Sequence, residues 1–142
     1  MPSAERSVTI QRPVNTVFAF VADGLTGPQW RTGVLDVAHV SGEGVGAVYR
    51  QGVKGPGGRR IAADYEITAY ERDQRVAFKA IAGPVRPTGA YAFNAVEGGT
   101  RMTFSLSAEL SGLQRLLGGA VQKTMDAEVA ALDKLKGLLE SR

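Results

Sequence analysis

Residues 113–139, LQRLLGGAVQKTMDAEVAALDKLKGLL, decide the fold of this chain of 142 residues. Apolar side chains recur along the stretch at helical spacing, and charged side chains fall largely opposite them. The pair Gly118 and Gly119 predicts a break near its start, since two glycines cost a helix about 2 kcal/mol relative to alanine. The stretch therefore predicts a short segment and then one long amphipathic helix, with an apolar stripe of Leu117, Val121, Met125, Val129, Leu132, Leu135 and Leu139.

The residues before this helix alternate in the manner of short strands. Runs rich in Val, Ile, Tyr, Phe and Thr are separated by Gly or Asp, and the connections are short enough to join antiparallel neighbours. Such strands should form one bent antiparallel sheet, with the C-terminal helix covering its apolar concave face. The predicted strands span residues 34–40, 47–53, 60–70, 75–82, 88–96 and 101–110.

The start of the chain adds one strand and two helical segments. Residues 7–12 alternate, which predicts a half-buried strand. Pro13 ends that strand and suits the first turn of a helix that ends near residue 23, because a missing N–H costs nothing there. Residues 24–33 carry Gly and Pro at both ends, so they allow a turn or one short helix carrying Trp30.

The order of the predicted elements, without a repeat or linker, indicates a single α+β domain spanning residues 1–142. Hydrophobic residues make up 44% of the chain and charged residues 22%, which is ordinary for a globular domain. The sequence contains no cysteine, which excludes disulfides, thiolate catalysis and cysteine-ligated metals. We expect no metal, no cofactor and no membrane span, and a cytoplasmic monomer or homodimer. The net charge of +3 comes without any block of like charges, so we expect no nucleic-acid partner.

The stretch GVKGPGGRR, residues 52–60, has the glycine spacing of a phosphate-binding loop. Gly58 and Arg59 stand where such a loop needs lysine followed by serine or threonine, and the residues that follow alternate as a strand rather than opening a helix. The stretch is interpreted as a hairpin tip, with glycines supplying positive φ. At the rim of a cavity this tip would act as a lid, where Arg59 or Arg60 could meet an acidic group.

Three titratable residues lie in the predicted strands and are candidates for catalytic groups. His39 is the only histidine, and no pattern supplies the partner that a general base needs, so we expect it to face solvent or to make a local hydrogen bond. Asp64 and Glu66 share one strand face opposite an apolar one, which predicts two solvated carboxylates. A bulge would invert that assignment.

The order of elements and several local stretches resemble the START-related superfamily, in its polyketide cyclase/dehydrase and lipid transport branch. The stretches are SVTIQRPVNTVFAFVAD at 7–23, Trp30, VGAVYRQ at 45–51, GGTRMTFSLSAEL at 98–110 and the terminal helix. The resemblance implies a helix-grip fold, in which a strongly curved antiparallel sheet wraps a long C-terminal helix, with two short helices after the first strand. Members bind hydrophobic ligands in the intervening cavity, including lipids, aromatic polyketides, plant hormones and quinones.

Aromatic side chains on the apolar strand faces are the candidate ligand contacts. These bulky side chains are mixed with the small Ala63, Ala80 and Ala95, which leaves volume unfilled. Tyrosine hydroxyls also need hydrogen-bonding partners when they are buried. Ordinary core packing is the alternative interpretation. Trp30 either walls the cavity entrance or fills the space between the first helix and the sheet. The expected ligand contacts are Trp30, Tyr49, Tyr65, Phe78, Tyr91, Phe93, Met102, Phe104 and Met125.

The resemblance implies that the chain binds a lipid-, quinone- or polyketide-like molecule, and two alternatives stay open. A cyclase or dehydrase needs a shaped pocket and a group that polarises a carbonyl, for which Tyr65, Tyr91 and Arg86 are candidates. Arg86, between the two prolines of GPVRPTG at 83–89, is otherwise a surface residue. A module that binds another protein is the second alternative, and an exposed apolar stripe on the terminal helix would favour it.

Overall fold

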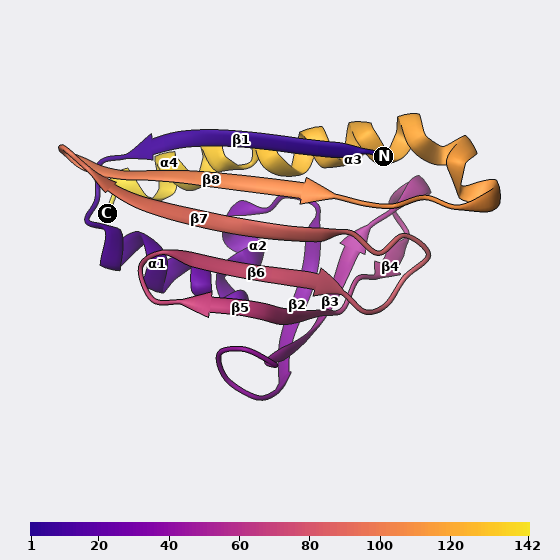
Figure 1. Cartoon of the computed structure of the whole chain (residues 1–142), viewed down its shortest axis with the longest axis horizontal. Helices are drawn as coiled ribbons and strands as arrows, with labels where there is room; N and C mark the ends of the chain where they lie inside the picture. The colour runs from indigo at the N-terminus through magenta and orange to yellow at the C-terminus, as the bar shows by residue number, and fades with distance from the viewer.

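The computed structural model describes residues 1–142, the side chain of Pro56 excepted. Eight strands form one antiparallel sheet: β1 Ser3–Ile10, β2 Val34–Ser41, β3 Val48–Lys54, β4 Arg60–Ala62, β5 Tyr65–Glu71, β6 Arg75–Ala80, β7 Thr88–Val96 and β8 Gly99–Ser107. Their order is β1-β8-β7-β6-β5-β3-β2, and β4 pairs with β3 beside this path. In Figure 1, β2 and β3 cross the direction of β7 and β8, which shows the strong curvature expected of a helix-grip sheet.

Apart from a short 3-10 turn between β3 and β4, the helical elements lie in two groups, one after β1 and one at the end of the chain (Figure 1). The first group confirms the two predicted helices, with a 3-10 turn between them. Pro13 stands at the N-cap of α1 (Val14–Ala22), one position before the first turn in which it was predicted. The second group runs along the sheet beside β1. The helical elements are α1 Val14–Ala22, η1 Gly24–Thr26, α2 Gly27–Trp30, η2 Pro56–Gly58, η3 Gly112–Leu117, α3 Gly118–Ala130 and α4 Leu132–Glu140.

The C-terminal helix is interrupted at Ala131, which the sequence did not predict. There the backbone N–H of Ala131 donates to Glu128, three residues back, at 3.1 Å, so a tighter turn divides α3 from α4. The predicted break at Gly118 is confirmed, because the 3-10 segment η3 ends at Leu117. Leu117 itself is 50% exposed, so the predicted apolar stripe is buried only further along the helix, at Met125, Val129, Leu132, Leu135 and Leu139.

Residues 60–70 are two strands rather than the single strand predicted. β4 pairs with the end of β3, where Val53 faces Ile61, and β5 pairs with its start, where Tyr49 faces Tyr65. Asp64, in the break between them, accepts a hydrogen bond at 3.2 Å from the backbone N–H of Gln51. Its carboxylate is therefore half-buried and structural, and the prediction of a freely solvated group was wrong.

Smaller differences concern strand ends. β1 begins at Ser3 rather than at residue 7, because its first residues pair with β8 up to Ser107, although Ser3, Glu5 and Arg6 are polar. The strands predicted at 75–82 and 101–110 end earlier, at Ala80 and Ser107, while β7 coincides with the predicted range 88–96. The stretch GVKGPGGRR forms the predicted hairpin, with Gly57 and Gly58 at φ of 69° and 78°.

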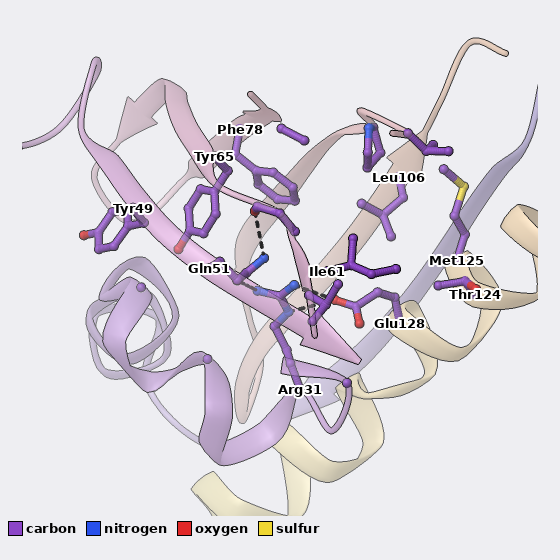
Figure 2. A pocket seen from close by; sticks show the side chains of 18 of the residues that line it. Arg31, Tyr49, Gln51, Ile61, Tyr65, Phe78, Leu106, Thr124, Met125 and Glu128 are labelled. Atoms are coloured by element: carbon purple, nitrogen blue, oxygen red, sulfur yellow. Dashed lines mark hydrogen bonds and ion pairs between the residues drawn. The ribbon is translucent and has the colours of Figure 1, made fainter. Parts of the chain in front are cut away.

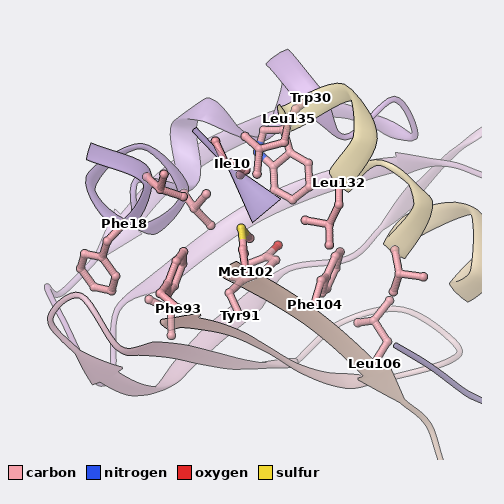
Figure 3. Close-up of a cluster of buried hydrophobic side chains, with 14 of the residues drawn as sticks. Ile10, Phe18, Trp30, Tyr91, Phe93, Met102, Phe104, Leu106, Leu132 and Leu135 are labelled. Carbon is pink, nitrogen blue, oxygen red and sulfur yellow. The ribbon is translucent and has the colours of Figure 1, made fainter. Parts of the chain in front are cut away.

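One hydrophobic core lies between the sheet and the helices α1, α2 and α4 (Figure 3). Phe93 packs edge-on against Phe18 of α1, with ring centroids 5.2 Å apart, and Met102 and Phe104 are fully buried. From α4, Leu132 and Leu135 close the core. This packing fills the end of the concave face that lies nearest α1 and α4.

Candidate functional site

A cavity of about 430 Å³ lies where the concave face is not filled, between the sheet and α3 (Figure 2). Strands β3 to β7 form one wall, α2 and the turn before it form a second, and α3 closes the third. The loop of Pro84, Val85 and Pro87 lines the rim beside Leu117. Most of the lining side chains are apolar, and a cavity of this size and character is typical of small-molecule sites.

An aromatic ladder, one residue from each of six successive strands, crosses the concave face. It runs from His39 and Tyr49 through Tyr65, Phe78 and Tyr91 to Phe104, with neighbouring ring centroids 4.6–5.8 Å apart. The sheet register sets the spacing, because each residue stands opposite or diagonal to the next. The middle of this ladder is the cavity floor.

Two glycines make room for the ladder. A Cβ at Gly24 would lie 2.5 Å from the Tyr65 hydroxyl oxygen and 2.8 Å from the Tyr49 ring. A Cβ at Gly89 would lie 2.5 Å from the Phe78 ring, which therefore lies over bare backbone of the neighbouring strand. Any side chain at either position would have to displace an aromatic ring of the ladder.

A buried polar cluster stands at one side of the cavity. Arg31, which follows α2, donates from Nε to Oε1 of Glu128 on α3 at 2.8 Å, and its Nη2 lies 2.7 Å from the same oxygen. Its Nη1 donates to Oε1 of Gln51 on β3 at 2.9 Å (Figure 2). Gln51 in turn donates from Nε2 to the carbonyl of Ala63 at 3.3 Å. The cluster ties three distant segments together at the cavity wall.

The guanidinium of Arg31 is held in its charged form by this cluster. Burial alone would lower its pKa, but the charge and hydrogen bonding of Glu128 outweigh burial and raise the pKa above its ordinary value. The side chains of Arg31 and Glu128 are 12% and 21% exposed, so the pair is largely desolvated. Arg31 and Glu128 together present a neutral but strongly polar surface to the cavity.

The hydroxyls of Tyr65 and Tyr91 face the same region. Burial raises the pKa of Tyr91 to about 12 and raises the pKa of Tyr65 further, although the positive charge of Arg31 opposes both shifts. Both tyrosines are therefore neutral donors at physiological pH.

Raised tyrosine pKa values predict a loss of stability at alkaline pH. An unfolded tyrosine ionises near pH 10, whereas Tyr91 in the folded chain ionises near pH 12. The contribution of Tyr91 to stability is therefore complete below pH 10 and is lost as the pH rises towards 12. Urea midpoints measured from pH 8 to 11 should fall above pH 10, and the fall should be smaller in Tyr91→Phe. An equal fall in the variant would contradict this origin.

Six of the nine predicted ligand contacts line the cavity, and three do not. Phe93, Met102 and Phe104 belong to the filled part of the core, where their alternation matches that of the cavity residues but the helices cover them. Trp30 is 1% exposed and lines the inner cavity, so it does not stand at the entrance. The six lining residues are Trp30, Tyr49, Tyr65, Phe78, Tyr91 and Met125.

The candidate Arg86 lies outside the cavity lining. It is exposed, and its Nε donates to the carbonyl of Gly83 at 3.3 Å. Arg60 of the hairpin is engaged as well, because its guanidinium forms two hydrogen bonds of 2.9 and 2.8 Å with Asp36 on β2. His39 is exposed, makes a local hydrogen bond with the carbonyl of Gly42 and stacks on Tyr49, as expected. The arginine that lines the cavity is instead Arg31, which the sequence did not single out.

Leucines near the cavity rim form an exposed apolar surface. Leu113 and Leu116 of η3 are 84% and 83% exposed, and Leu117 lines the rim. Gln114 donates to the carbonyl of Pro84 at 2.6 Å, which ties η3 to the neighbouring loop at the rim. The apolar surface thus precedes the terminal helix instead of running along it.

The described residues contain no group of three or more His, Asp or Glu side chains placed to hold a metal ion. Among them, no helix is long and apolar enough to cross a membrane.

A family model for polyketide cyclase/dehydrase and lipid transport proteins matches residues 1–140. Among curated proteins, an uncharacterized protein of Mycobacterium tuberculosis is 32% identical over 103 residues, which are 70% of this chain and 60% of the relative. The chain therefore matches less than two-thirds of that relative's length.

Two solved structures share the fold at low sequence identity. A START superfamily protein from Mycobacterium smegmatis has a TM-score of 0.73 and 12% identity, over 96% of this chain and 98% of the other. The ZhuI aromatase/cyclase from Streptomyces sp. R1128 has a TM-score of 0.68 and 15% identity, over 91% and 89%. These likenesses agree with the helix-grip architecture.

Proposed function

Because the chain belongs to the polyketide cyclase/dehydrase and lipid transport family, we propose that it binds a hydrophobic or aromatic small molecule between the sheet and α3. The observation that carries this proposal is the cavity of about 430 Å³, whose floor is the middle of the aromatic ladder. A stack of rings with a mostly apolar wall favours a planar ring system. The few polar groups at one side would orient it.

The proposal is tested with N-phenyl-1-naphthylamine, an uncharged probe that fluoresces in apolar surroundings. Trp30 is the only tryptophan of the chain and lines the cavity, so excitation of Trp30 should transfer energy to a probe bound there. We expect saturable binding at one site, with quenching of Trp30 at the same concentrations. Weak, unsaturable emission without quenching of Trp30 would contradict the proposal.

A cyclase- or dehydrase-type reaction in the same cavity is the second candidate function. It is favoured by the two tyrosine hydroxyls and the Arg31 guanidinium at one side of the cavity, which can polarise a carbonyl and stabilise an enolate. The aromatase/cyclase from Streptomyces shares the fold alone. Turnover of a poly-β-ketone analogue that depends on Tyr65 and Tyr91 would distinguish catalysis from ligand binding alone.

A further inference from the structure

The charges around the cavity cancel. Four charged side chains line it: Arg31 and Glu128 form the buried pair, while Lys54 and Asp23 are exposed at the rim. The positive charge that a ligand would meet in the interior is therefore already neutralised by Glu128 at 2.7 Å. Pairing of this kind removes the long-range attraction that an anion needs to offset its own desolvation.

Although the Arg31–Glu128 pair has no net charge, hydrogen-bond donors are still available at the site. Arg31 carries five N–H groups, and the contacts with Glu128 and Gln51 use three of them. Tyr65 and Tyr91 add two hydroxyls, both protonated at neutral pH. Arg31, Tyr65 and Tyr91 all line the same cavity. The site thus offers several donors to an acceptor oxygen without offering net positive charge.

We propose that the cavity selects an uncharged ring compound with a ketone or quinone carbonyl, and that Glu128 is the residue that excludes carboxylates. This inference rests on the proposed binding function and names its ligand class. A carbonyl oxygen accepts from the Arg31 N–H groups and the tyrosine hydroxyls at no electrostatic cost. A carboxylate in the same place would lie close to the Glu128 carboxylate in a desolvated site, and the repulsion would offset its attraction to Arg31.

A matched pair of ligands tests the proposal. 2-Acetylnaphthalene and 2-naphthoate share one ring system and differ in the group that would meet Arg31. By calorimetry at pH 7, we expect the wild-type protein to bind the ketone about tenfold or more tightly than the carboxylate. Glu128→Gln keeps an oxygen beside Arg31 but removes its compensating charge. We expect this variant to bind the carboxylate about tenfold more tightly than wild type does.

Glu140→Gln is the matched control, because it removes the same charge from the C-terminal helices at a position where Glu140 pairs with Lys136 outside the cavity lining. It should leave the ligand preference unchanged. Equal affinity of wild type for the two ligands would overturn the inference, whether or not Glu128→Gln folds. Unchanged carboxylate affinity in a folded Glu128→Gln would also overturn it.

The two proposals fail in different ways. If N-phenyl-1-naphthylamine binds at the cavity and the ketone does not, binding of apolar molecules stands and the inferred ligand class is wrong. If none of the three compounds binds, the proposed function fails and the inference fails with it.

Discussion

Replacing Trp30 with alanine is expected to lower the free energy of unfolding by about 3–5 kcal/mol, the range for large aromatic truncations in protein cores. Trp30 is 1% exposed and packs edge-on against Tyr91 and Phe104, with ring centroids 6.0 and 6.2 Å apart. Its removal leaves a void next to a cavity that is already present, so the surrounding side chains have little to collapse onto. Urea denaturation followed by circular dichroism measures the loss, because the variant has no tryptophan fluorescence.

Leu25 provides the control for this substitution. It lies in η1, just before the helix that carries Trp30, and is 52% exposed. Leu25→Ala should therefore cost about 0.5 kcal/mol or less, as exposed substitutions commonly do. A loss at Trp30 no larger than the loss at Leu25 would show that the indole does not stabilise the core.

The fold could be predicted from the sequence wherever one face of an element is buried and the other is not. β7 matches its predicted range because Tyr91 and Phe93 point into the protein while their neighbours point away. The break between β4 and β5 could not be predicted. The alternation of Ile61, Ala63 and Tyr65 continues through it unchanged, and the interruption arises from pairing with two ends of the same strand.

Part of the candidate site could likewise be predicted from the sequence, and part could not. Tyr65, Tyr91 and Phe104 share one face of the sheet, and their periodicity is the same. Only the placement of α1 and α4 over one end of the sheet makes Phe104 core and leaves Tyr65 on a cavity wall. Periodicity within strands carries no information about which part of a curved sheet the helices cover.

The polar cluster was missed for a different reason. Arg31 lies 20 residues from Gln51 and 97 residues from Glu128, so no local motif joins them. The one available signal was the position of Glu128 beside Val129 on the otherwise apolar side of the terminal helix. A charged residue there predicts a buried partner, but a single sequence does not say which one.

Filling the cavity from α3 should abolish binding while leaving the fold intact. Val121 is half-buried, lines the cavity and belongs to a helix, where tryptophan and valine have similar propensities. Val121→Trp is expected to weaken binding of N-phenyl-1-naphthylamine about a hundredfold or more, equivalent to about 2.7 kcal/mol, because the indole would occupy the space of the probe. Direct excitation of the probe measures this without interference from the added tryptophan.

The stability of the same variant separates this explanation from general disruption. A large side chain forced into a filled core costs about 1–3 kcal/mol, whereas one that enters an empty cavity of about 430 Å³ should cost little. Ala127→Trp, on the exposed side of α3, adds the same side chain and should change neither binding nor stability. Retained binding in a folded Val121→Trp would place the probe elsewhere, whereas a destabilised variant would indicate that the space is not available to a ligand. Lost binding with stability preserved is the combination that only an accessible internal site produces.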